Sequence, residues 1–272
     1  MRRLFVFISL SSTLLAADFR DAGRIDRFNV LASGSAGPVV LFDNSHAETA
    51  GNADWTVTGA YSDFADTLRH HGFTIRSVDN GQIDQAALNG VAVVVLPEPN
   101  HRLAPGEVSA LTAFVQGGGG LFAIGDHGGS DRDNDGWDSP MILNELTPQM
   151  GIKFNYDKYS ESPLKPSIAD SAIVTGVSAL GAWGGCSLTL SGNAKVELTY
   201  GAANGSRPFV ASSTFWSGRV VAIGDSSPLD DGTGAPGNHL YPQYNNPQFG
   251  IAQFALNVVN WLAKKGQEAV DH

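Results

Sequence analysis

Short apolar runs recur through the first half of the chain, separated by polar and glycine-rich segments. The runs at residues 38–43, 91–96 and 120–124 are apolar over almost their whole length, and residues 73–78 alternate in part. Strands that are buried on both faces of a parallel sheet have this pattern. The runs therefore predict four strands of one buried sheet.

Segments with helical periodicity lie between these runs. One apolar stripe with i, i+3, i+4, i+7 spacing consists of Tyr61, Phe64, Ala65 and Leu68. Gly72 stands where a helix C-terminus favours glycine. Pro105 opens a second helix over residues 105–115, and a short helix is expected around residues 83–88. Strands that alternate with helices at this spacing predict a parallel sheet with right-handed crossovers.

The pattern changes after residue 124. Residues 128–166 form a long polar and aromatic region with one helix expected near residues 141–150. Shorter strands with turn signals between them follow at residues 188–190, 196–200 and 208–212, and a buried strand at 219–225 and an amphipathic helix at 249–262 complete the series. The predicted fold class is α/β: a flavodoxin-like parallel sheet sandwiched by helices, with antiparallel additions in the second half.

The N-terminus has the features of a secretory signal. Arg2 and Arg3 precede a short apolar core, and Ala16 and Ala17 offer a small-residue cleavage site. We expect residues 1–17 to be removed, residues 18–37 to act as a linker, and residues 38–266 to form a single α/β domain with a loop insertion at about 128–166. The protein is then secreted or periplasmic. The alternative is that these first residues are a strand or helix of the fold.

Composition narrows the functional classes. The 272 residues carry a formal net charge of −10, which argues against non-specific binding of nucleic acid through a basic patch. A polyanionic substrate that binds through cations stays open, because a bound cation reverses the local charge. The one cysteine, Cys186, excludes an intramolecular disulfide and is expected to be a buried structural thiol.

The most specific chemical signal is Gly125-Asp126-His127-Gly128-Gly129, directly after the apolar run at residues 120–124. A strand that ends in G-x-nucleophile-x-G is the elbow by which α/β hydrolases present a serine or cysteine. Here a histidine occupies the central position beside an aspartate. Imidazole and carboxylate together suit metal ligation or proton transfer.

Polar residues follow the other predicted strands as well, and the carboxyl ends of parallel strands form the usual ligand crevice. We predict three catalytic residues: His127, His46 and Asp126. We predict that a crevice Mg²⁺ or Mn²⁺ is held by Asp43, Asp225 and Glu48. The predicted substrate-binding residues are Asn44, Trp55, Trp137 and His239. Turn capping is the alternative for Asp43, and solvation is the alternative for His46 and His239. A structural role is the alternative for Asp126, His127 and Asp225, and Glu98 and His101 are expected to be peripheral.

Acidic residues alternate in the loop that follows the elbow. Asp131, Asp133 and Asp135 are followed by Gly136, a spacing typical of loops that bind Ca²⁺ through carboxylate oxygens. No helix precedes this loop, which excludes an EF-hand. We expect Ca²⁺ to order the loop, and a solvated acidic turn is the alternative.

The strand order and the Gly125-x-His127-x-Gly129 elbow resemble the class I glutamine amidotransferase-like superfamily, over roughly residues 38–130 and 208–264. The chain looks most like its non-amidotransferase branches, the trehalose-utilisation-like proteins and the domain shared by gliding-motility and intraflagellar-transport proteins. Residues 172–177 resemble a segment that follows the elbow in those branches. The family's nucleophilic cysteine has no counterpart at position 127, so the resemblance does not imply glutamine hydrolysis through a thioester.

These observations predict a secreted metal-dependent hydrolase. A phosphodiester, nucleic acid included, is the expected substrate, because hard cations suit phosphate oxygens. Two alternatives stay open. One is a non-catalytic cell-envelope module that binds a glycan or a partner in the same crevice, and the other is a carbohydrate or ester hydrolase with paired carboxylates and no metal. No membrane span and no protein partner are predicted.

Overall fold

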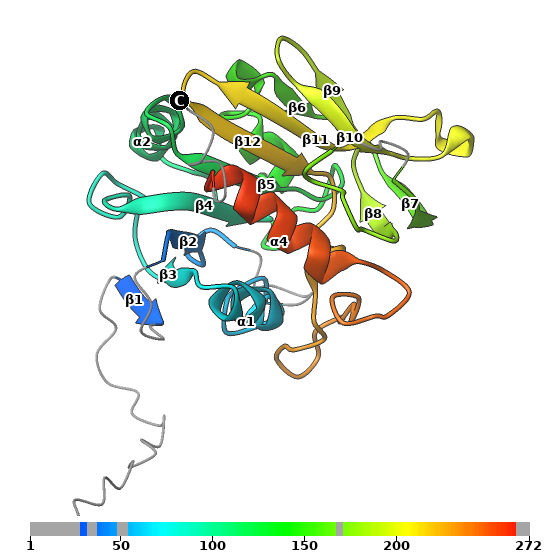
Figure 1. The fold of residues 1–272 in the computed structure, drawn as a ribbon, viewed down its shortest axis with the longest axis horizontal. Coiled ribbons are helices and arrows are strands. Elements are labelled where there is room, and N and C mark those ends of the chain that lie inside the picture. The colour runs from blue at the N-terminus through cyan, green and yellow to red at the C-terminus, as the bar shows by residue number, and fades with distance from the viewer. Residues whose placement is uncertain (1–27, 32–36, 48–53, 167–170, 265–272) are drawn as a thin grey trace, which may run out of the picture.

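The computed structural model describes residues 28–31, 37–47, 54–166 and 171–264 (Figure 1). Its centre is an eight-stranded sheet with the order β1-β3-β2-β4-β5-β12-β11-β10. The strands are β1 (Phe28–Leu31), β2 (Val39–Asp43), β3 (Thr74–Val78), β4 (Val91–Pro97), β5 (Gly120–Ile124), β10 (Lys195–Thr199), β11 (Pro208–Phe215) and β12 (Gly218–Ile223).

Five neighbouring strands of this sheet are parallel. They are β3, β2, β4, β5 and β12, while β1, β11 and β10 join the two edges in antiparallel pairing. This order is the flavodoxin-like order of a doubly wound sheet. The predicted fold class, including the antiparallel additions in the second half, is therefore confirmed.

Helices cover both faces of the sheet. Helices α1 (Ser62–His70) and α4 (Ile251–Leu262) pack on one face, and α2 (Pro105–Gln116) packs on the other. In Figure 1, α4 (red) crosses the sheet near β4 and β5. Phe122 of β5 joins the first layer, because its ring lies edge-on to Phe64 of α1 and Phe254 of α4, with both centroid distances 6.3 Å.

The segment between β5 and β10 builds an additional layer next to the carboxyl ends of the strands. It contains helix α3 (Ser139–Leu143) and two antiparallel pairs, β6 (Ile152–Phe154) with β9 (Leu188–Leu190) and β7 (Tyr159–Leu164) with β8 (Leu180–Gly185). The predicted loop insertion at 128–166 is thus partly ordered as strands. Tyr159, Tyr200 and Phe209 form a chain of ring contacts that attaches β7 to the main sheet.

Three local predictions differ from the structure. In place of the helix expected around residues 83–88, residues 85–90 form turns: the Asp84 carboxylate caps the Ala87 N–H and the Leu88 N–H bonds to the Asp84 carbonyl oxygen, but Gly90 follows at a φ of 71° and ends the segment after about one turn. The helix expected near 141–150 is shorter, since Pro148 interrupts it and starts a separate 3₁₀ turn. Strand β1 lies within the segment predicted as a linker and pairs with β3. The predicted signal at 1–17 lies outside the described residues.

Substitutions at two glycines, one at a close contact and one in open space, test the packing of the fold. A Cβ at Gly224 would lie 2.0 Å from the backbone oxygen of Cys186, whereas a Cβ at Gly106 in the first turn of α2 would meet nothing within 4 Å. We expect Gly224→Ala to lower the free energy of unfolding by about 2 kcal/mol or more. We expect Gly106→Ala to raise it by a few tenths to about 1 kcal/mol. Urea unfolding measures the change in both variants. Equal unfolding midpoints for Gly224→Ala and Gly106→Ala would contradict a close contact at Gly224.

Candidate functional site

Three carboxylates follow the parallel strands at the same edge of the sheet. Glu98 comes after β4, Asp126 after β5 and Asp225 after β12, and all three are at most 4% exposed. A cavity of about 90 Å³ lies at this edge. Its lining residues come from six segments of the chain: Trp55, Asp126, His127, Arg132, Lys158, Trp183, Ser226, Ser227 and Tyr241.

The glycines of the elbow allow the surrounding layer to approach closely. A Cβ at Gly125 would lie 2.7 Å from the Phe154 ring, and a Cβ at Gly128 would lie 2.7 Å from the Tyr156 ring. The N-terminus of α3 fixes the turn from its other side. The Asp126 N–H donates to Ser139 Oγ at 2.8 Å, and the Gly129 N–H donates to Asp138 Oδ2 at 2.7 Å. The elbow is therefore a rigid turn rather than a free loop.

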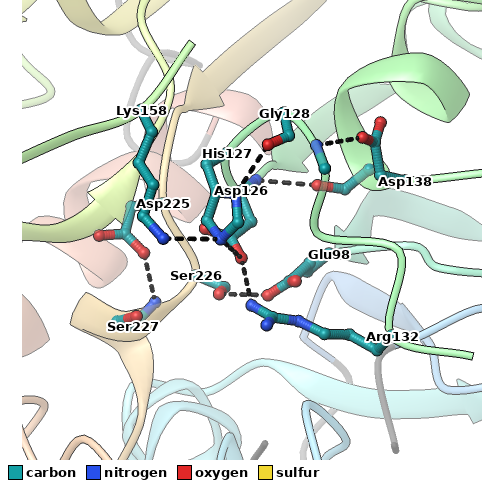
Figure 2. A network of polar contacts seen from close by, with 12 residues as sticks. Glu98, Asp126, His127, Gly128, Arg132, Asp138, Lys158, Asp225, Ser226 and Ser227 are labelled. Carbon is teal, nitrogen blue, oxygen red and sulfur yellow. Dashed lines mark hydrogen bonds and ion pairs between the residues drawn. The ribbon is translucent and has the colours of Figure 1, made fainter. Parts of the chain in front are cut away.

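The side chain of His127 lines the cavity, and its two ring nitrogens contact Gly128 and Lys158 (Figure 2). Its Nδ1 lies 2.9 Å from the carbonyl oxygen of Gly128, and a carbonyl oxygen only accepts, so Nδ1 carries the hydrogen. Its Nε2 lies 3.3 Å from Lys158 Nζ, which only donates. These two contacts are satisfied together when Nδ1 carries the hydrogen and Nε2 accepts from Lys158 at the wall of the cavity.

Two cations flank the elbow. Arg132 donates to Asp126 Oδ2 at 2.9 Å, and Lys158 contacts His127. Figure 2 shows the two side chains reaching the elbow from opposite sides and from different segments. His127 Nε2 is 3.9 Å from Asp126 Oδ2, so imidazole, carboxylate and both cations form one cluster.

Asp225 lies beneath the cavity and is completely buried. Its carboxylate accepts the backbone N–H groups of Trp183 and Ser227. Burial and the negative charge of Asp126 nevertheless raise the pKa of Asp225 to about 7. Beside it, Ser226 Oγ donates to Glu98 Oε2, and Glu98 adopts a positive φ of 45° at the end of β4.

Asp43 and His46 belong to a different buried cluster. His46 Nδ1 lies 2.9 Å from Asp43 Oδ2, and His46 Nε2 lies 3.4 Å from Glu107 Oε2 of α2. Glu107 also accepts the backbone N–H groups of Ala104 and Ile83. The three side chains join β2 to the start of α2, and none of them lines the cavity at the elbow.

The charges of this cluster control the titration of His46. Burial alone would lower its pKa, but the charges and hydrogen bonds of Asp43 and Glu107 outweigh burial and raise the pKa to about 10. His46 is therefore a cation at neutral pH. A cationic imidazole has no lone pair to offer, so this position suits a structural ion pair better than a general base or a metal ligand.

The remaining predicted residues are dispersed. Trp55 lines the cavity, is 1% exposed, and its Nε1 donor has no hydrogen-bond partner in the described part of the chain. Asn44 instead bridges Asp79 and the Val57 N–H. Trp137 lies under the Arg102 guanidinium at 4.1 Å, and the exposed His239 contacts the Tyr241 ring. Glu48 lies outside the described residues.

The acidic loop is arranged differently from a calcium loop. Asp131 accepts the N–H groups of Asp135 and Gly136, so its oxygens close the loop on itself. Among the described residues, the one group of three potential metal ligands within 4.8 Å is His101, Asp133 and Asp135. The loop thus directs two of its three aspartates toward a histidine that was expected to be peripheral.

Among the described residues, the carboxylates near the crevice do not converge on a site for a divalent ion. Asp126 is neutralised by Arg132, and Asp225 is enclosed by backbone N–H groups. Asp43 is paired with a cationic histidine. A metal site needs several free donors that converge on one point, and these carboxylates are separately engaged.

Sequence reasoning did not find several residues of the cavity. Lys158, Trp183 and Tyr241 come from loops or short strands whose sequence has no periodicity to place them. Arg132 lies within the acidic loop. The sequence feature that could have predicted its role is its position as a single cation between alternating aspartates. Ser226 and Ser227 directly follow Asp225, so the same argument from the carboxyl ends of the strands could have predicted them.

A larger cavity of about 780 Å³ lies away from this edge, against β10, β11 and Trp261 of α4. Its buried carboxylate, Glu197, accepts hydrogen bonds from Ser171 and Ser212. These polar groups satisfy one another, and Lys195 and Glu197 are the only ionisable side chains among the described residues that line this cavity. The chemically equipped cavity is the smaller one at the elbow.

No family model and no curated protein matches the chain, but several solved structures have the same fold. The mmIFT52 N-terminal domain aligns with a TM-score of 0.62 and 18% identity, over 82% of this chain and 97% of that one. A cytoplasmic protein of Salmonella typhimurium, STM3548, aligns at 0.57 and 13%, over 83% and 98%. A putative ThuA-like protein of Bacteroides uniformis aligns at 0.51 and 13%, over 86% and 96%.

These similarities agree with the predicted resemblance to intraflagellar-transport and trehalose-utilisation-like proteins. At such identities they establish the shared fold alone. In the described ranges, every helix is too short or too polar to cross a membrane.

The cluster of Asp43, His46 and Glu107 predicts a specific dependence of stability on pH. Because the pKa of His46 is raised from 6.5 to about 10 in the folded state, its contribution is complete below pH 6.5 and is lost as the pH rises through 10. We expect that loss to be on the order of 2–4 kcal/mol. Urea unfolding between pH 6 and pH 10 should show it in the wild type and not in His46→Gln. The exposed control His70→Gln should follow the wild type, and parallel curves for His46→Gln and wild type would refute the assignment.

Proposed function

We propose that this protein is a hydrolase that binds an anionic group of its substrate at the elbow cavity, with His127 as the general base. The observation that carries the proposal is the arrangement around His127: Gly128 holds its Nδ1, and its Nε2 lies at the cavity 3.3 Å from Lys158, with Arg132 lining the same cavity. A phosphodiester is the substrate class that this arrangement favours.

The electrostatics favour an anion. Lys158 and Arg132 both line the cavity, and Arg132 is paired with the carboxylate of Asp126, so the charge of Lys158 is the one that attracts an anionic group. Ser226 and Ser227 add hydroxyl groups, and the unpartnered Nε1 of Trp55 is one more donor. A cavity of about 90 Å³ has room for several water molecules, or for one compact group such as a phosphate. The rest of the substrate would lie outside it.

The geometry supplies the parts of a hydrolytic step. A water molecule that takes the place of Lys158 Nζ at His127 Nε2 gives a proton to that nitrogen, and its oxygen attacks the phosphorus of a diester held by Lys158 and Arg132. As the new P–O bond forms, the P–O bond to the leaving alcohol breaks; the alkoxide takes a proton from solvent, and His127 then returns its proton to solvent. The cations stabilise the charge that develops on the equatorial oxygens. Gly128 holds the protonated Nδ1 and so keeps the basic nitrogen directed at the water. No step requires a crevice metal, for which this donor set is not suited.

The elbow also bears on the superfamily to which the chain belongs. We infer that it is a non-amidotransferase member of the class I glutamine amidotransferase-like superfamily, in which a general base has replaced the nucleophile at the strand end. The secretory features at residues 1–17 support export. The sole thiol, Cys186, is buried in another layer, which agrees with chemistry that does not use a thioester.

The proposal is tested with aryl phosphodiester, phosphomonoester, acetate and glycoside substrates, measured at steady state. We expect hydrolysis of the phosphodiester, and we expect His127→Gln to lower kcat by about 10²–10⁴-fold with little change in KM. Lys158→Met should raise KM and also lower kcat, because it removes a charge that binds the anion and stabilises the charge that develops on it in the transition state. His70→Gln serves as the matched control and should equal the wild type.

Two outcomes would overturn the proposal. Unchanged phosphodiester turnover in His127→Gln would remove the general base. The absence of turnover on all four substrates, together with glycan binding that is weakened by Trp183→Ala, would favour the non-catalytic binding module, since Trp55, Trp183 and Tyr241 also line the cavity.

A further inference from the structure

Three potential ligands gather outside the elbow cavity. His101 follows β4, and Asp133 and Asp135 belong to the loop after the elbow. One ligand atom from each lies within 4.8 Å of the other two. His101 Nδ1 and Asp133 Oδ2 are already 2.8 Å apart, with side-chain exposures of 52% and 21%. The group is therefore accessible to solvent yet held together before any ion arrives.

The loop is shaped so that these aspartates face the histidine. Asp131 binds the Asp135 and Gly136 N–H groups, and Asn100 Oδ1 accepts the Arg132 N–H at 3.2 Å. The two bonds of Asp131 close the loop on itself, and the Arg132 bond ties the start of the loop to the segment that carries His101. Asp133 Oδ2 is paired with His101, and Asp135 uses Oδ1 to accept the Trp137 N–H at 2.8 Å.

A second observation concerns the Asp133 carboxylate itself. Its Oδ1 atom is buried and has no hydrogen-bond partner among the described residues. A buried carboxylate oxygen without a partner is costly, because burial removes the water that would solvate it. A cation next to Asp133 would recover that cost. The neighbouring cation Arg102 does not supply this charge, since it is bound to Glu145 and stacks on Trp137.

We infer that His101, Asp133 and Asp135 form a site for a divalent first-row transition ion, with Zn²⁺ as the representative. One imidazole and two carboxylates are a donor set for zinc-like ions, and water would complete the coordination. Calcium prefers six to eight oxygen ligands and does not favour imidazole. We therefore infer a zinc-like ion in place of the Ca²⁺ expected from the sequence, because Asp131 binds backbone N–H groups of its own loop and His101 is the third ligand.

The site has a connection to the elbow cavity. Arg132 lies in the chain between Asp131 and Asp133, and its guanidinium binds Asp126 at 2.9 Å. An ion that ties Asp133 and Asp135 to His101 would restrain this loop and so hold Arg132 at the cavity. This connection, unlike the ion site itself, rests on the proposed function.

The test is a calorimetric titration of Zn²⁺ into chelator-treated full-length protein, with Ca²⁺ and Mg²⁺ in parallel, followed by thermal denaturation with and without each ion. We expect one Zn²⁺ per chain and a rise in Tm on binding. His101→Gln and Asp135→Asn should each lower the Zn²⁺ affinity at least about tenfold. Both substitutions keep hydrogen-bonding groups on exposed side chains, and circular dichroism confirms that each variant is folded.

Two control variants separate this site from other sources of binding. His70→Gln tests the exposed His70-His71 pair, and His127→Gln tests the elbow cavity; both should keep the wild-type Zn²⁺ affinity. Zinc binding that persists in His101→Gln, or that is lost in His70→Gln, would overturn the inference. So would Ca²⁺ binding that His101→Gln leaves unchanged. Because no substrate is present, these outcomes do not depend on whether the phosphodiesterase proposal holds.

Discussion

The accumulation of buried negative charge at one edge of the sheet is the constraint that shapes this molecule. Parallel pairing of β2, β4, β5 and β12 brings their carboxyl ends together, and each of these strands is followed by a carboxylate that is almost completely buried: Asp43, Glu98, Asp126 and Asp225. Such charges repel one another in a medium of low dielectric constant. The fold is stable only if every one of them is compensated.

Different groups compensate the negative charges of these carboxylates, and the kind of group distinguishes a structural carboxylate from one at the candidate site. Asp43 pairs with a cationic histidine, and Asp225 accepts backbone N–H groups while its pKa rises to about 7. Asp230, on the next loop, likewise accepts backbone N–H groups, and burial raises its pKa. Only Asp126 is compensated by a side chain, Arg132, that comes from an insertion outside the sheet. Ligand chemistry is therefore concentrated at the one carboxylate whose partner is not part of the rigid scaffold.

Apolar periodicity predicted most of the fold, because the strands and the three covering helices are set by burial, which the sequence records directly. The same argument predicted that Asp43, Asp126 and Asp225 would reach one edge. It did not predict that His46 would turn away from that edge, because its position depends on Glu107, which belongs to the packing of α2. Nor did it find Lys158, since that residue lies in a segment where neither burial nor turn chemistry repeats. Ligand sets assembled across loops are a property of tertiary packing, and local sequence patterns do not encode them.

Cys186 offers an experimental consequence of this architecture. Its N–H donates to Gly224 at the end of β12, its carbonyl oxygen accepts from Tyr200, and its thiol is completely buried, which raises the pKa of the sulfur well above its ordinary value. In the closed structure the thiol is both inaccessible and protonated, so alkylating reagents cannot react with it. The rate of alkylation consequently reports how often the added layer opens from the sheet. Alkylation of this single cysteine therefore measures the rate of local unfolding of the segment between β8 and β9, next to the end of β12.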